Sequence, residues 1–104
     1  MLSQGYQDKI EFVKGLDKAV SNKVGGIIKV EYVIFQHKEH ESWINEYLVV
    51  KYRGGAIQAR NCSMNSNGAI LEELAKMAFS SQVYASELDT YQDLLKNKNS
   101  NIFY

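Results

Sequence analysis

The stretch YLVVKYRGGAIQARNC, residues 47–62, decides the fold because it predicts two β-strands joined by a tight turn. Apolar and polar residues alternate along it, which is typical of strands that rest one face on a core. The Gly54-Gly55 pair is typical of a two-residue hairpin loop, in which the central residues adopt a positive φ. We therefore predict an antiparallel hairpin centred on these glycines.

This register gives the hairpin two different faces. Tyr52 then lies opposite Ile57 and Val50 lies opposite Ala59, so these four residues belong to the core. The other face collects aromatic, cationic and small side chains, namely Trp43, Tyr47, Val49, Lys51, Arg53, Gln58, Arg60 and Cys62. What covers that second face is the main question that the sequence raises.

The rest of the chain predicts the elements around this hairpin. Apolar residues at three- and four-residue steps predict an amphipathic helix from about residue 6 to the Gly25-Gly26 pair. Alternation over GIIKVEYVIFQ, residues 26–36, predicts a further strand. Helical periods return over residues 69–79 and 86–97.

The expected fold class is therefore α+β, in the order α-β-β-β-α-α. We expect one domain over residues 1–104, with a three-stranded antiparallel sheet, an N-terminal helix and two C-terminal helices. Residues 97–104 are expected to fray unless Ile102, Phe103 and Tyr104 pack on the domain.

Composition narrows the classes of function. Twelve Lys and Arg residues balance twelve Asp and Glu residues, so no overall field draws the protein to nucleic acid or to an anionic membrane. The lone Cys62 cannot form an internal disulfide, and the first residues lack the apolar stretch of a signal peptide. No apolar run approaches the roughly 20 residues of a membrane span. We expect a cytoplasmic protein that does not enter a membrane.

Neither a metal site nor a catalytic constellation is predicted. His37 and His40 have acidic neighbours in QHKEHES, residues 36–42, but their spacing matches no common metal motif. No base lies near Cys62 in the sequence to activate its thiol, and the carboxylates of the C-terminal half have the spacing of solvated helix faces. We expect a protein that is not an enzyme and has no cofactor.

The second hairpin face carries the functional hypotheses. Between Val49 and Arg60 it has three cations and no acid. Trp, Tyr and Arg often anchor protein interfaces, so our leading hypothesis is protein binding. The predicted partner-binding residues are Trp43, Tyr47, Lys51, Arg53 and Arg60, with Glu87, Asp89 and Asp93 as a second, acidic patch.

Three alternatives explain the same face. Cations beside aromatic rings suit phosphate contact and base stacking, which predicts nucleic-acid binding. A second copy of the chain could cover the face in a homodimer. The last helix could also cover it, with Glu87, Asp89 or Asp93 facing the cations.

The order of elements resembles two families. The α-β-β-β-α part is similar in topology to the double-stranded RNA-binding domain, although NSNGAILEELAKMA, residues 65–78, has Glu72 and Glu73 where that family has a Lys cluster. The whole order resembles one class of small phage anti-CRISPR proteins, which cover the nucleic-acid site of an RNA-guided nuclease. This resemblance implies an inhibitor from a phage or mobile element that acts sterically, and it assigns no site residues.

Overall fold

The computed structural model describes residues 2–63, 66–79 and 87–104 of the chain. The elements are α1 (Gln4–Val20), β1 (Ile27–His37), β2 (Ile44–Tyr52), β3 (Ile57–Asn61), α2 (Asn67–Phe79), α3 (Leu88–Lys96) and β4 (Ser100–Phe103). The strands form one antiparallel sheet in the order β3-β2-β1-β4. The α+β class, the N-terminal helix and the two C-terminal helices are as predicted. No helix in the described ranges is long and apolar enough to cross a membrane.

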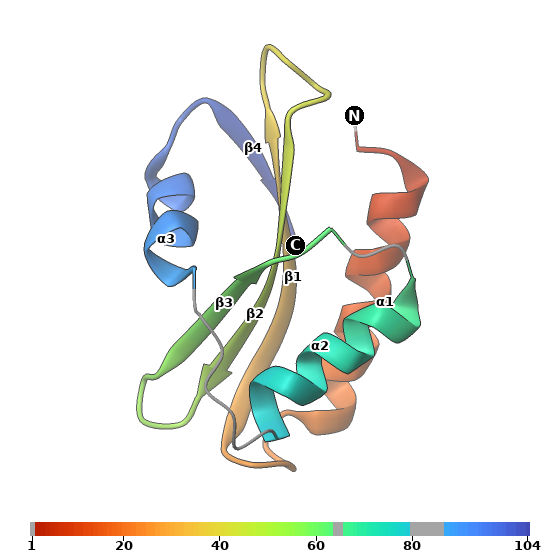
Figure 1. Cartoon of the computed structure of the whole chain (residues 1–104), viewed down its shortest axis with the longest axis vertical. Helices are drawn as coiled ribbons and strands as arrows, with labels where there is room; N and C mark the ends of the chain where they lie inside the picture. The colour runs from red at the N-terminus through yellow and green to blue at the C-terminus, as the bar shows by residue number, and fades with distance from the viewer. Residues whose placement is uncertain (1, 64–65, 80–86) are drawn as a thin grey trace.

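Helices cover both faces of the sheet. In Figure 1, α1 and α2 lie on one side of the strands and α3 lies on the other. The core under α1 and α2 contains Leu2, Ile10, Val13, Ile27, Val30, Tyr32, Ile34, Leu48, Val50, Cys62, Ile70, Leu74 and Met77. A smaller core under α3 contains Val33, Phe35, Tyr47, Val49, Ala59 and Tyr91. Both faces of β1 and β2 are therefore buried over much of their length.

Local sequence explains where the helices begin and end. After α1, the chain turns at Asn22, Gly25 and Gly26, all of which have positive φ and so break the helix. At the start of α2, the Ser66 hydroxyl accepts a hydrogen bond from Ala69 N at 3.1 Å and thereby caps the helix. The predicted start of the last helix at residue 86 lies outside the described residues.

The sheet has four strands, so the prediction of three was wrong. The additional strand is β4, which pairs with the end of β1 from Ile34↔Phe103 to His37↔Ser100. Phe103 packs on the α1 and α2 core, and Ile102 packs on the α3 core. Residues 100–103 therefore pack on the domain, which was the stated alternative to fraying of residues 97–104. This packing depends on contacts with β1, which is far away in the sequence.

The predicted register of the β2–β3 hairpin was also wrong. Lys51 lies opposite Ile57, and Tyr52 N donates to Ala56 O at 2.8 Å. Three residues, 53–55, therefore form the loop in place of two. Because side chains alternate along a strand, this shift by one residue moves every β3 side chain to the other face of the sheet relative to β2.

Candidate functional site

The hairpin face that was predicted as one surface is divided between the two sides of the sheet. Tyr47 belongs to the core under α3, whereas Cys62 belongs to the core under α1 and α2. Arg60 contacts Glu73 of α2, and Lys51 contacts Glu31 of β1. The prediction of a single basic and aromatic face was therefore wrong, because it depended on the two-residue loop.

Tyr47 is fully buried and does not reach the surface. Its ring lies 5.9 Å from that of Phe35 and 5.4 Å from that of Tyr91 in α3. Burial raises the pKa of Tyr91 to about 12, so its ring stays neutral at ordinary pH. The three rings join α3 to the sheet, and Tyr47 is consequently a core residue in place of the predicted contact anchor.

The alternative in which the last helix covers this face holds only for the part around Tyr47 and Val49, which packs against α3. The ion pairs of Lys51 and Arg60 use acids outside the predicted acidic patch. Arg60 Nε lies 3.0 Å from Glu73 Oε1, and Lys51 Nζ lies 3.8 Å from Glu31 Oε1. Of the predicted acidic patch, Asp89 and Asp93 are exposed and Glu87 is half-buried, with its backbone N–H donating to Ala59 O at 2.8 Å. The described ion pairs of the hairpin therefore use acids of β1 and α2.

The two exposed members of the predicted anchor set lie at opposite ends of the sheet. Arg53 is in the β2–β3 loop, whereas Trp43 directly precedes β2 in the β1–β2 loop. Figure 1 places these two loops at the lower and upper ends of the strands. Trp43 and Arg53 therefore do not form one contact surface within a single copy of the chain.

The rings of His37, His40 and Trp43 form an aromatic cluster at the turn between β1 and β2, which we call the hairpin tip. His37 is the half-buried last residue of β1, whereas His40 and Trp43 are exposed in the β1–β2 loop. Trp43 is 59% exposed, and its ring stacks on that of His40 at 4.0 Å between centroids and 25° between planes. The His37 ring meets Trp43 edge-on at 5.1 Å. An exposed Trp that is already fixed in place loses little side-chain freedom on binding.

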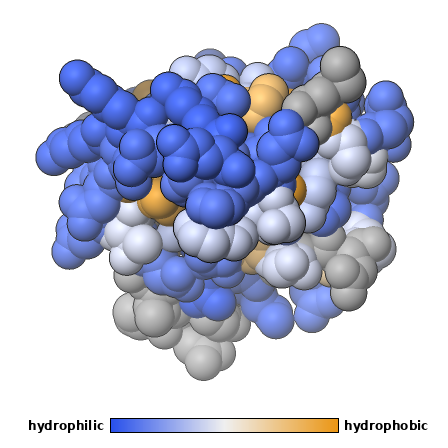
Figure 2. All heavy atoms as spheres, turned by 90° about the horizontal axis from the view of Figure 1, so that it is seen from above, coloured by the Kyte–Doolittle hydropathy of each residue, from blue (hydrophilic) through white to orange (hydrophobic). Residues whose placement is uncertain are grey.

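Hydrogen bonds fix the backbone of the hairpin tip. His37 N donates to Trp43 O at 3.0 Å, and Trp43 N donates to His40 O at 2.9 Å. The N–H groups of Glu39 and His40 both donate to His37 Nδ1, at 3.1 and 3.2 Å. This end of the molecule, seen from above in Figure 2, is mainly hydrophilic with small, separate hydrophobic spots. The tip thus offers an aromatic anchor with polar surroundings.

The described residues also define the chemistry of the histidines and the cysteine. Among residues 2–63, 66–79 and 87–104, no group of three or more His, Cys, Asp or Glu side chains could hold a metal ion. Cys62 is buried, and this burial raises the pKa of its thiol to about 11. Its Sγ donates a hydrogen bond to Arg60 O at 3.2 Å. The thiol is therefore protonated at neutral pH, which opposes a nucleophilic role.

Sequence reasoning missed a buried polar network around Glu46. Its Oε1 accepts from Tyr32 Oη at 2.7 Å and from Lys9 Nζ at 2.9 Å, and its Oε2 lies 3.4 Å from Ser63 Oγ. The carboxylate is 6% exposed and borders a cavity of about 340 Å³ between α1 and the residues before α2. The signal was present in β2, where Glu46 interrupts the inward apolar series between Ile44 and Leu48.

The Glu46 network has a structural role that its partners define. It joins α1, β1 and β2 through one carboxylate, and Lys9 compensates the buried charge. Comparisons with protein-family models, with curated proteins and with solved structures found no match. The candidate site therefore rests on geometry, and the hairpin tip is the exposed feature with the most definite arrangement.

Proposed function

We propose that this protein is a non-enzymatic protein-binding module that engages its partner through the hairpin tip. The observation that carries the proposal is the stacking of the 59% exposed Trp43 on His40. Tryptophan combines a large apolar ring with an N–H donor, and it is among the residues that contribute most to binding in protein interfaces. The surrounding polar groups of the loop would form the rim of such an interface.

The basic and aromatic face on which the hypothesis of nucleic-acid binding rested is not present as one surface. The three cations Lys51, Arg53 and Arg60 do not share a face, and two of them lie in ion pairs. Phosphate binding by a strand face needs cations that act together along one groove. We therefore keep this alternative as an outcome of the test.

The finer form of the proposal is a steric inhibitor from a phage or mobile element. This finer proposal comes from the resemblance in element order to small phage anti-CRISPR proteins. The shared order covers the first six elements, and β4 is an additional seventh element. An inhibitor of this class would present a rigid anchor to a nuclease and cover its nucleic-acid site. Addition of the purified protein to an RNA-guided nuclease would then reduce target cleavage, and Trp43→Ala would restore it.

The test of protein binding compares three baits in an extract of the source organism. The wild-type protein, Trp43→Ala and Phe79→Ala are immobilised, and retained proteins are quantified by mass spectrometry. Phe79 is the matched control because it is 55% exposed on α2. We expect a partner that the wild type and Phe79→Ala retain and that Trp43→Ala loses. Equal retention by all three baits would contradict the proposal.

Two further measurements separate the alternatives. Anisotropy of labelled single-stranded and duplex DNA and RNA is followed at low and at physiological salt, because phosphate contacts weaken steeply as salt rises. Salt-sensitive binding of nucleic acid would replace protein binding as the proposed function. Sedimentation velocity, in turn, would reveal a homodimer, in which case the tip would be examined first as a contact between copies.

A further inference from the structure

The outer edge of β4 presents backbone groups that can pair with another strand. Lys38 N donates to Asn99 O, so this pair is hydrogen-bonded and the bonded pairs then alternate along β1 and β4. Gln36↔Asn101 and Ile34↔Phe103 are bonded pairs by this alternation. The N–H and C=O groups of Ser100 and Ile102 consequently point away from β1, towards the free side of the sheet.

The neighbouring edges of the sheet are partly occupied by the protein itself. Beyond the end of β4, Val30 N of β1 donates to Asp17 Oδ1 at 2.8 Å. On the opposite edge, Ala59 O of β3 accepts from Glu87 N at 2.8 Å. Such contacts discourage the addition of a further strand. In residues 2–63, 66–79 and 87–104, no such hydrogen bond reaches the backbone of Ser100 or Ile102.

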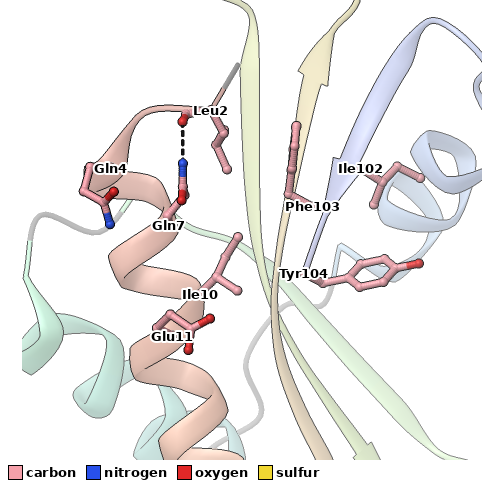
Figure 3. Close-up of a pocket in the computed structure, with 8 residues that line it drawn as sticks. All are labelled: Leu2, Gln4, Gln7, Ile10, Glu11, Ile102, Phe103 and Tyr104. Atoms are coloured by element: carbon pink, nitrogen blue, oxygen red, sulfur yellow. Dashed lines mark hydrogen bonds between the residues drawn. The ribbon is translucent and has the colours of Figure 1, made fainter.

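A groove runs between β4 and the first half of α1. It has a volume of about 560 Å³ and is lined by Leu2, Gln4, Gln7, Ile10, Glu11, Ile102, Phe103 and Tyr104. In Figure 3, the side chains of Leu2 and Ile10 point from the α1 side towards β4, whereas Ile102 and Tyr104 point away from α1. The groove therefore has apolar side chains facing it and the edge strand beside it. Glu11 is the charged member of the eight lining residues.

We infer that this groove and the outer edge of β4 together bind an extended segment of a partner protein. The segment adds to the sheet as a fifth strand, with backbone hydrogen bonds to Ser100 and Ile102. Because side chains alternate along a strand, every second residue of the segment faces the groove, where an apolar side chain fits. A Lys or Arg of the segment near Glu11 suits the charge of the groove wall. The unpaired backbone groups are what select a strand over a helix as the occupant.

This surface is separate from the hairpin tip and is tested independently of it. A random-peptide library displayed on phage is selected against the wild-type protein, and the recovered peptides are synthesised with a fluorescent label. Each amide of a selected peptide is then N-methylated in turn, and binding is followed by anisotropy. We expect a loss of about fivefold to tenfold at every second amide and little change between them, because alternate N–H groups of a strand point to the same edge and only those at the edge beside β4 donate to it.

Two variants locate the peptide on the protein. Ile102→Pro removes an outward N–H, whereas the bonded pairs of β4 with β1 use its neighbours. Glu11→Lys reverses the charge of the groove, and Glu72→Lys is its matched control. Both of these acids are 71% exposed and pair with a Lys on their own helix. We expect weaker binding of basic peptides to Ile102→Pro and Glu11→Lys, and unchanged binding to Glu72→Lys.

Several outcomes would overturn the inference. Failure of the selection to give a peptide that binds in solution would do so, as would N-methylation effects without a period of two. Equal binding to Glu11→Lys and the wild type, with amide NMR shifts away from residues 100–104, would place the peptide elsewhere. A homodimer that Ile102→Pro dissociates would assign the edge to a second copy of the chain in place of a foreign segment.

Discussion

Asp17 of α1 occupies the position that a neighbouring strand would take beside Val30 of β1. Its Oδ1 accepts from Val30 N at 2.8 Å and from the Ser21 hydroxyl, while its Oδ2 lies 3.2 Å from Lys29 Nζ. One carboxylate thus ties the end of α1 to the edge of the sheet and satisfies a backbone donor there. Natural sheets protect their edges from other chains by such devices.

Replacement of Asp17 by Ala should destabilise the fold by about 1–3 kcal/mol, because it leaves a backbone donor and a hydroxyl without their acceptor. Urea unfolding at neutral pH measures this change. Asp8→Ala is the control on the same helix, since Asp8 is exposed and accepts from the exposed Gln4. Equal stability of the two variants would refute the role of Asp17.

The contribution of Asp17 should depend on pH in the acid range. Burial raises the pKa of Asp17, but hydrogen bonds from Ser21, Val30 and Lys29 outweigh it, and the net pKa lies below the ordinary value of 3.8. A lowered pKa in the folded state means that the unfolded chain binds its proton first as pH falls. The stabilisation is therefore complete above the ordinary value and is lost as pH falls through the folded pKa.

Unfolding free energies of the wild type and Asp17→Asn over this range test the pH dependence. The gap between the two proteins should be constant near neutrality and should narrow below about pH 4. A gap that stays constant into strong acid would show that the charge of Asp17 contributes nothing.

Replacement of Tyr91 by Ala should release α3 from the sheet. Tyr91 is 5% exposed and its ring contacts those of Phe35 and Tyr47, so the loss should be about 3–5 kcal/mol. Leu95→Ala on the same helix is the control, since Leu95 is 41% exposed. Thermal unfolding measures the loss, and binding of a hydrophobic dye reports exposure of the second core. A small effect equal to that of Leu95→Ala would mean that α3 is held by other contacts.

Replacement of Glu46 by Gln should cost about 1–3 kcal/mol, because Lys9 and Tyr32 lose a charged acceptor. Glu39→Gln in the exposed β1–β2 loop should change stability little. Lys9→Met, measured alone and with Glu46→Gln, gives the coupling between the two residues. Additive effects would indicate that the ion pair between Lys9 and Glu46 does not contribute to stability.

Cys62 should resist thiol reagents in the folded protein. With a pKa of about 11, roughly one thiol in a thousand is ionised at pH 8, and the side chain is also buried. Reaction with a disulfide reagent should therefore be much slower in buffer than in denaturing urea. Comparable rates in both solvents would show that the site opens readily.

The helices and the central strands could be predicted because their signals are local. The stripe in α1 that contains Ile10 and Val13 indicates which face meets the sheet, and the alternation in β2 correctly placed Leu48 and Val50 together. These features depend on neighbours within one element. Trp43 was predicted on the second face of the β2–β3 hairpin, and it is exposed in the β1–β2 loop instead.

The divided hairpin face could not be predicted with the same means. Two glycines are compatible with loops of two or three residues, and the choice between them decides whether Arg60 shares a face with Tyr47. In the structure, apolar burial of Cys62 under α1 and α2 and of Ala59 under α3 accompanies the three-residue loop. For this reason the candidate site is the hairpin tip and not the predicted face of the β2–β3 hairpin.

The sequence by itself determined the α+β class, the order of its first six elements and the face of β2 that carries Leu48 and Val50, because periodicity along the chain encodes them. The tertiary structure decided the addition of β4, the placement of α3 opposite α1 and α2, and the contacts of Asp17 and Glu46. These features join residues that are distant in the sequence. Their physical cause is the need to bury both faces of the sheet and to satisfy its edge and core polar groups, which no local pattern specifies.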